Sequence, residues 1–178
     1  DFSKCSSKYL NCWIPNSDFP IFIKNIENQT GINSQFYENL NIFKYLPEQI
    51  HGPFIDAYDL SSVNGKKYTK NRGQRIYTIS IPLNNSIQIK FGKLNEVFDI
   101  QQGSFFIYDN ISNDSRNIRD TEIFHTIINN NDDETYVLNI NIREKDMITN
   151  NLMVEMVEIV ESYENNLIIE NIDNNKNK

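Results

Sequence analysis

Hydrophobic and polar residues alternate with a period of two along much of the middle of the chain. The pattern is clearest in five runs, RIYTISIPLN, IQIKFG, EVFDI, GSFFIYDN and TYVLNINIRE, which are separated by Asn, Asp and Gly. Alternating β-branched and aromatic residues are typical of half-buried strands, and Asn, Asp and Gly favour the turns between strands. Residues 75–143 therefore predict an antiparallel β-sandwich or a jelly-roll barrel.

The flanking segments follow other patterns. Residues 1–20 contain two prolines and are expected to be irregular, residues 21–26 predict a first strand, and LNIFKY predicts a strand that ends before Pro47. After Arg143, NNLMVEMVEIVESYENN has the spacing of an amphipathic helix, although its Val and Ile residues also suit a hairpin. The tail DNNKNK is expected to be disordered. We therefore expect an irregular segment at 1–29 that packs on a barrel at 30–145, and a C-terminal extension at 146–178.

Composition limits the class of protein. A chain of 178 residues with 39% hydrophobic residues suits one domain with an ordinary core. The net charge of -7, with 17 basic against 24 acidic residues, argues against a nucleic-acid partner. Heavy Asn usage suggests an AT-rich genome, such as that of a virus or protist. No apolar run of about 18 residues could span a bilayer. We expect a soluble domain, cytoplasmic or virion-associated, unless an anchoring segment lies outside this sequence.

Two cysteines, Cys5 and Cys12, lie near the beginning of the chain. They have no Cys or His companions at the spacing of a zinc site. A small disulfide loop and two free thiols both remain open.

Five pieces of the sequence, in order, match the motifs of one family. YLPEQIHGPFID carries Tyr45, Gln49, Pro53 and Asp56 at the offsets of a Tyr, Gln and Pro-His-x-Asp motif, with Phe54 in place of the histidine. RIYTISIPLN, IQIKFG, DIQQGSFFIYDN and FHTIINNNDDETYVLNINIRE follow. Residues 38–143 thus resemble the Fe(II)- and 2-oxoglutarate-dependent oxygenases of the prolyl 4-hydroxylase type. The resemblance implies a mainly β (α+β) fold, a double-stranded β-helix or jelly-roll with flanking helices.

The resemblance also assigns roles to individual residues. Asp56 and His125 match two ligands of an iron site held by two histidines and one carboxylate, and Phe54 replaces the third ligand. Thr135 stands where the family has a lysine that would bind the distal carboxylate of 2-oxoglutarate. Tyr45 matches a tyrosine that contacts this co-substrate. Arg143, or Arg75, is a weaker candidate for the same task.

Each of these residues also has an ordinary structural interpretation. Asp56 could cap the turn at DAYDLSS, and His125 could be a hydrogen-bonded histidine at the end of a strand. His51 is expected to be a solvent-facing histidine in a loop. Arg75 and Arg143 would by default be solvated or paired with carboxylates.

Three functions follow from these alternatives. The leading hypothesis is a prolyl 4-hydroxylase-like protein that has lost catalysis, a pseudoenzyme without cofactor that binds a protein or extended peptide. A second is an active oxygenase that uses Fe(II) and 2-oxoglutarate to hydroxylate a peptidyl side chain. The third is an unrelated jelly-roll structural protein, which a separation of more than about 8 Å between Asp56 and His125 would favour, since ligands lie about 2 Å from a shared metal.

Overall fold

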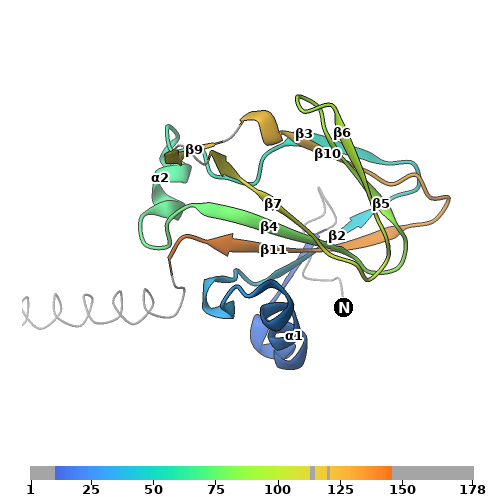
Figure 1. Ribbon diagram of the computed structural model, residues 1–178, viewed down its shortest axis with the longest axis horizontal. Coiled ribbons are helices and arrows are strands. Elements are labelled where there is room, and N and C mark those ends of the chain that lie inside the picture. Colours follow the sequence, from blue (N-terminus) through green and yellow to red (C-terminus); the bar gives the residue numbers. More distant parts are fainter. Residues whose placement is uncertain (1–10, 113–114, 120, 146–178) are drawn as a thin grey trace, which may run out of the picture.

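Two antiparallel β-sheets lie face to face (Figure 1). The computed structural model describes residues 11–112, 115–119 and 121–145. One sheet has five strands in the order β1-β2-β11-β4-β7, and the other has four in the order β3-β10-β5-β6. Helix α1 covers the outer face of the five-stranded sheet, and α2 lies at one end of the barrel (Figure 1). The expected mainly β class is confirmed.

The elements have the following bounds. The five-stranded sheet contains β1 (Asn11–Ile14), β2 (Leu40–Tyr45), β11 (Thr135–Arg143), β4 (Arg75–Pro82) and β7 (Phe106–Asp109). The four-stranded sheet contains β3 (Ile50–Phe54), β10 (His125–Ile128), β5 (Ile87–Phe91) and β6 (Glu96–Ile100), and a small ribbon contains β8 (Ile111–Ser112) and β9 (Ser115–Arg119). The helices are α1 (Pro20–Thr30), α2 (Val63–Thr69) and three short 3₁₀ turns, η2 (Asn16–Asp18), η3 (Ser34–Phe36) and η4 (Thr121–Ile123). All five runs predicted from alternation, and the strand before Pro47, are confirmed.

Strand β11 shows how alternation builds two hydrophobic layers. Val137 belongs to the cluster between the two sheets, together with Tyr45 and Ile127. Leu138 and Ile140 belong instead to the layer that α1 covers. Because successive side chains of a strand point to opposite faces, one strand serves both layers, and its interior face can carry polar residues at the site.

The N-terminal predictions were partly wrong. The strand expected at residues 21–26 is helix α1, because Pro20 occupies its first turn and Ile23 and Ile26, three residues apart, are buried against the sheet. The helix ends at Gly31, whose φ of 70° suits glycine. Residues 11–14 are not irregular either, since β1 pairs with β2. The C-terminal helix and tail expected from the sequence lie outside the described residues, as does Cys5. Within the described residues, no helix is long and apolar enough to cross a membrane.

Strand β3 was not predicted, because Gly52 and Pro53 suggest a turn. The strand lies at the edge of its sheet, where a proline without an N–H is tolerated. Gly52 has a φ of 134°, and a Cβ atom there would lie 2.7 Å from the backbone oxygen of His125. Glycine therefore permits the close approach of β3 to β10, and this pairing sets Phe54 opposite His125.

Candidate functional site

Asp56 and His125 lie together inside the barrel. His125 opens β10 and is completely buried, and Asp56 follows the end of β3 by two residues. Their side chains face each other, with His125 Nε2 3.8 Å from Asp56 Oδ2. This separation is far below the distance of about 8 Å that would have favoured an unrelated jelly-roll.

Tyr108 joins these two side chains. Its hydroxyl group donates to Asp56 Oδ2 at 3.0 Å and lies 3.2 Å from His125 Nε2. The neighbouring strand adds Thr78, whose hydroxyl lies 3.0 Å from the same carboxylate oxygen. Tyr108 was missed by the sequence reasoning, because alternation along GSFFIYDN does not reveal that Tyr108 in β7 pairs with Thr78 in β4. We refer to Asp56, Thr78, Tyr108 and His125 as the barrel network.

Burial favours the uncharged forms of His125 and Tyr108 in the barrel network. Burial lowers the pKa of His125, and the opposing effect of Asp56 is smaller. The ring Nδ1 lies 3.2 Å from the Ile123 carbonyl oxygen, so a neutral ring that donates there presents Nε2 as an acceptor toward Tyr108, whose single proton serves either Asp56 Oδ2 or His125 Nε2 at a given moment. Burial, followed by the negative charge of Asp56, raises the pKa of Tyr108. The phenol therefore keeps its proton near neutral pH.

Phe54 lies directly against the histidine of this network. Its ring centroid is 4.4 Å from that of His125 and 4.8 Å from that of His51. His51 was expected in a solvent-facing loop, but it is half-buried in β3, where its ring packs 5.8 Å from that of Tyr45. The pairing of β3 with β10 draws the histidine inward, and burial lowers the pKa of His51.

Thr135 lies beside Tyr45, its partner in the pairing of β11 with β2. Both are buried, and burial raises the pKa of Tyr45. Thr135 Oγ1 donates to Asn129 Oδ1 at 2.9 Å, and the amide groups of Asn131 and Asn85 lie 3.3 and 3.4 Å from the same hydroxyl. A cluster of neutral amides thus surrounds the position where the family has a lysine.

Arg143 and Arg75 lie at the other end of their strands and share one carboxylate. Arg75 forms two hydrogen bonds with Glu38, from Nε at 2.9 Å and from Nη2 at 2.7 Å. Arg143 Nη1 lies 3.3 Å from the same carboxylate, and Arg143 Nη2 donates to the Tyr68 carbonyl oxygen at 2.6 Å. Thr135 and Arg143 are therefore not brought together, since β11 separates them along its whole length.

The sequence suggested that Asp56 could cap the turn after β3, but another aspartate caps it. Asp59, not Asp56, accepts hydrogen bonds from the backbone N–H and hydroxyl of Ser61. The Asp56 carboxylate instead points toward Thr78 and Tyr108. Across the part of the chain that the structure describes, no group of three His, Cys, Asp or Glu side chains could hold a metal ion.

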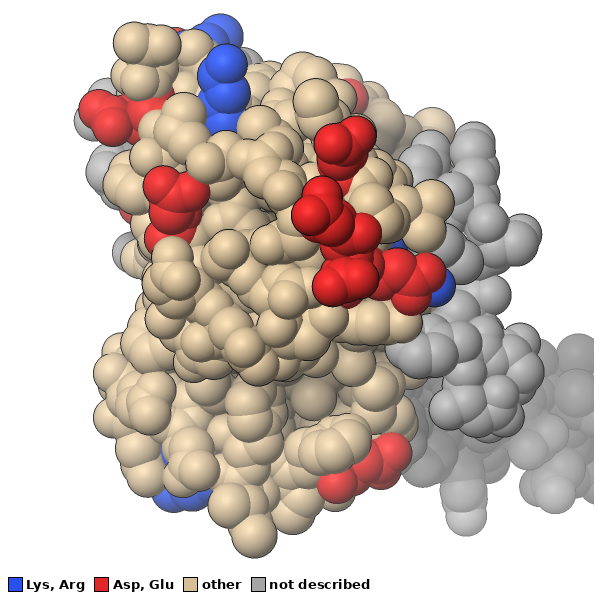
Figure 2. All heavy atoms as spheres, turned by 90° about the vertical axis from the view of Figure 1, so that its right-hand side faces the viewer, with Lys and Arg blue, Asp and Glu red and all other residues tan. Residues whose placement is uncertain are grey.

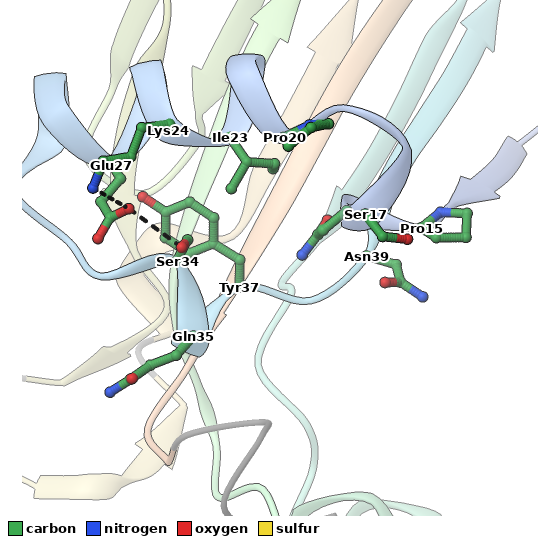
Figure 3. A pocket seen from close by; sticks show the side chains of 11 residues that line it. Pro15, Ser17, Pro20, Ile23, Lys24, Glu27, Ser34, Gln35, Tyr37 and Asn39 are labelled. Atoms are coloured by element: carbon green, nitrogen blue, oxygen red, sulfur yellow. Dashed lines mark hydrogen bonds and ion pairs between the residues drawn. The ribbon is translucent and has the colours of Figure 1, made fainter.

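A separate cavity of about 570 Å³ lies between α1 and residues 34–39 (Figure 3). Its lysine and glutamate neutralise each other, with Lys24 Nζ 3.2 Å from Glu27 Oε2, and Ser34 also donates to Glu27. None of the residues of the barrel network lines this cavity. It is therefore not part of the candidate site.

Known proteins with similar sequence or structure fit this geometry. No family model matches the chain. A protein of Acanthamoeba polyphaga mimivirus, named a candidate prolyl 4-hydroxylase, is 31% identical over 99 residues, which are 54% of this chain and 40% of the relative. The match thus spans about two fifths of the length of that curated relative.

The solved structure of a viral collagen prolyl hydroxylase from Paramecium bursaria Chlorella virus-1, in its complex with 2-oxoglutarate, has a TM-score of 0.59 and 16% identity. The alignment covers 76% of this chain and 79% of that one. The structural match agrees with the two facing sheets, and the chain has a double-stranded β-helix fold similar to that of the viral hydroxylase. The resemblance to prolyl 4-hydroxylase-like proteins is thereby confirmed.

Proposed function

We propose that this chain is a prolyl 4-hydroxylase-like protein that has lost ordinary iron and 2-oxoglutarate chemistry and acts as a binding module. The observation that carries the proposal is the surroundings of His125. Phe54 packs its ring against that imidazole at 4.4 Å, at the position that the family fills with the first histidine ligand.

The donor atoms present do not fit the family's iron site. That site needs two imidazole nitrogens and one carboxylate on one face of the metal, with the remaining positions open to 2-oxoglutarate and oxygen. A phenyl ring offers no lone pair suited to iron. Tyr108 already contacts both remaining groups, since its hydroxyl donates to Asp56 Oδ2 and lies 3.2 Å from His125 Nε2. The Tyr108 hydroxyl thus occupies the space between Asp56 and His125 where a metal ion would bind.

The position that should bind 2-oxoglutarate has also lost its charge. A lysine would give the distal carboxylate a charge-assisted hydrogen bond, which is about twice as strong as a neutral one. Thr135 is neutral and is hydrogen-bonded to Asn129. The two arginines that could replace the lysine, Arg75 and Arg143, pair with Glu38. A dicarboxylate would therefore enter this barrel without a cationic partner among these residues.

A peptide-binding role agrees with what remains of the fold. The solved viral structure is named a collagen prolyl hydroxylase, and collagen chains have an extended, polyproline-like conformation. We assign the present protein an extended peptide or protein partner on that basis. A barrel that keeps its architecture without the metal site would retain surfaces for such a partner.

Calorimetric titration with Mn(II), with and without 2-oxoglutarate, tests the loss of the metal site. We expect no saturable binding to the natural chain and a gain of binding by a Phe54→His, Thr135→Lys double variant. Adding His125→Gln to this variant is the matched control and should abolish the gain. Tight binding of Mn(II) by the natural chain, enhanced by 2-oxoglutarate, would overturn the proposal.

A second candidate, an oxygenase with unusual ligands, is favoured by one observation. Asp56 Oδ2, His125 Nε2 and the Tyr108 hydroxyl lie 3.0 to 3.8 Å from one another, so the phenol oxygen could act as a third donor. This candidate predicts Fe(II)-dependent formation of succinate from 2-oxoglutarate, abolished by His125→Ala. An absence of succinate with a peptide library would exclude it.

A further inference from the structure

A second polar cluster lies beside α2, outside the barrel network. It surrounds a cavity of about 210 Å³ whose lining includes three cationic side chains, Lys67, Arg72 and Arg143. Glu38 and the rings of Tyr58 and Tyr68 complete the walls used in the argument below. We refer to this as the arginine cavity.

Arg143 brings unused hydrogen-bond donors to the arginine cavity. It is only 2% exposed, although arginine is rarely so buried unless it is well paired. Nη2 donates to Tyr68 O, but Nε and Nη1 have no hydrogen-bond partner in the described part of the chain. Nη1 lies 3.3 Å from Glu38 Oε1, close enough for an ion pair without the alignment of a hydrogen bond. Buried donors left in this state are costly. Both atoms have less than 1 Å² of accessible surface, so an anion in the cavity satisfies them only when the cavity wall around Arg143 shifts to admit it.

The charges around the cavity do not balance. Glu38 is the only acidic side chain among the lining residues, and it already receives two hydrogen bonds from Arg75. Burial lowers the pKa of Arg143, and the charges of Arg75 and Arg72 add to this lowering while Glu38 opposes it. Three lining cations against one carboxylate leave an excess of two positive charges, in a chain whose net charge is -7.

The opposite end of the barrel has the reverse character. Figure 2 faces the end away from α2 and shows more acidic than basic side chains there. The loop between β10 and β11 contains Asp132, Asp133 and Glu134, and the first two are exposed. An approaching anion would therefore be repelled from that end and attracted toward the arginine cavity.

One wall of the arginine cavity is ordered by contacts within the protein. The Tyr58 ring lies under two guanidinium groups, with Arg75 Cζ 4.6 Å and Arg143 Cζ 5.0 Å from its centroid. Such contacts hold the planar groups in place. Helix α2, which supplies Lys67, is anchored by Gly65, since a Cβ atom there would lie 1.8 Å from the Asp59 carbonyl oxygen. Binding then requires ordering of the exposed Lys67 and Arg72 side chains, but not of the Tyr58 wall.

We propose that the arginine cavity binds a phosphate monoester group. A phosphate monoester carries a charge of about -1.5 to -2 at neutral pH and three strong acceptor oxygens, which match the excess of two positive charges and the free guanidinium donors. A carboxylate would neutralise only half of that excess. The group could belong to a phosphorylated side chain of a peptide partner, and this source rests on the proposed peptide-binding role. It could also belong to a free phosphate compound, and neither this source nor phosphate binding itself depends on that role.

Titration of the full chain with inorganic phosphate and with a short phosphoserine peptide tests the proposal. We expect saturable binding that weakens roughly tenfold or more in Arg72→Gln and in Lys67→Gln, since each removes a charge-assisted contact. Lys66→Gln is the matched control, because this exposed lysine lies on the same helix but does not line the cavity. Thermal unfolding of each variant checks that exposed Lys67 and Arg72 can be replaced without loss of the fold.

The titrations distinguish the two sources of the phosphate group from the absence of a site. Tighter binding of the phosphoserine peptide than of its unphosphorylated form and of inorganic phosphate supports a phosphorylated protein partner. Equal binding of peptide and inorganic phosphate supports a free phosphate compound. Failure of both ligands to bind, or equal weakening by Lys66→Gln, overturns the site. Formation of succinate from 2-oxoglutarate would overturn the proposed loss of catalysis and leave the phosphate titration unaffected.

Discussion

The barrel network and the arginine cavity differ in how far the chain satisfies its own polar groups. In the barrel network, the Asp56 carboxylate lies within hydrogen-bond distance of the Tyr108 and Thr78 hydroxyl groups, and each ring nitrogen of His125 has a polar atom of the protein within 3.2 Å. In the arginine cavity, buried Arg143 retains donors that nothing in the described chain accepts. The resemblance to an oxygenase directs attention to the first cluster, but hydrogen-bond accounting points to the second as the place for a ligand.

One residue connects the two clusters. Arg75 holds Glu38 through Nε and Nη2, and its Nη1 lies 3.5 Å from the backbone oxygen of Asp56. Arg75 therefore links the turn that positions Asp56 to Glu38, the carboxylate that pairs with both arginines. A scaffold can therefore lose one site and keep the same loop for another use, which separates fold from function.

The largest expected effect comes from removing the carboxylate that the arginines share. Glu38→Gln leaves the two guanidinium groups of Arg75 and Arg143 without a counter-charge, and both are largely buried. Breaking such a pair typically costs about 3–5 kcal/mol of unfolding free energy. Urea denaturation measures it. Glu27→Gln, which removes the half-buried partner of exposed Lys24, is the control and should cost about 1 kcal/mol or less. Equal losses in the two variants would show that the arginine cluster is solvated.

Asp56→Ala tests the barrel network in the same way. The substitution removes the acceptor that the Tyr108 and Thr78 hydroxyl groups share, and leaves Tyr108 with His125 Nε2 at 3.2 Å and Thr78 with Asn141 Oδ1 at 3.1 Å as acceptors. Each lost hydrogen bond contributes about 0.5–1.5 kcal/mol, so we expect a total loss of about 1–3 kcal/mol in urea denaturation, below that of Glu38→Gln. Asp99→Ala is the control, because Asp99 is exposed and accepts only from Gln88 among its recorded contacts. A loss for Asp56→Ala no greater than the control's would mean that water replaces the carboxylate.

The sequence predicted the fold where one physical rule dominated. Five runs in residues 75–143 alternate, and all five are strands, whereas β10 and the β8–β9 ribbon in the same region were not predicted. Helix α1 was misjudged because its Ile and Phe residues have strand propensity, whereas burial of Ile23 and Ile26 on a sheet face decided the outcome. Strand β3 was missed because Gly52 and Pro53 have the signature of a turn, and only the close approach of β10 explains the glycine.

The candidate site was predictable only in part. The resemblance selected Asp56 and His125, which the structure places 3.8 Å apart. Tyr108 was not selected, since a tyrosine in a strand usually serves the core and the contact with Asp56 joins residues far apart in the chain. The sharing of Glu38 by two arginines was equally hidden, because spacing along the chain carries no information on which carboxylate a distant guanidinium meets.

The substitution Gly65→Ala should disturb the arginine cavity and leave the barrel network unchanged. In Gly65→Ala, the new methyl group would lie 1.8 Å from the Asp59 carbonyl oxygen, so α2 must shift. Such overpacking costs about 2 kcal/mol. We expect weaker phosphate binding, because Lys67 moves with α2, and an unchanged environment of Tyr108 and His125 in NMR spectra. Gly92→Ala is the matched control, since a Cβ atom there meets nothing within 4 Å. Unaltered phosphate affinity in Gly65→Ala would show that α2 does not shape the cavity.

The smallest expected effect is a dependence of stability on pH that belongs to the barrel network alone. Burial lowers the pKa of His125, so the unfolded chain, with a histidine pKa near 6.5, binds a proton at a higher pH than the folded chain does. Stability contributed by the neutral ring is therefore complete above about pH 6.5 and falls as the pH drops, by at most about 1.4 kcal/mol per pH unit for each histidine.

Urea denaturation between pH 8 and pH 5 measures this slope. His51 adds to it in the same direction, because burial also lowers its pKa, but it is only half-buried. We therefore expect His125→Gln to flatten the profile more than the control His51→Gln does, whereas Arg72→Gln should leave the slope unchanged because arginine does not titrate in this range. A slope that survives His125→Gln would assign the dependence to groups outside the barrel network. A stability that rises on acidification would contradict a buried neutral histidine, and with it the closed hydrogen-bonded arrangement of Asp56, Tyr108 and His125.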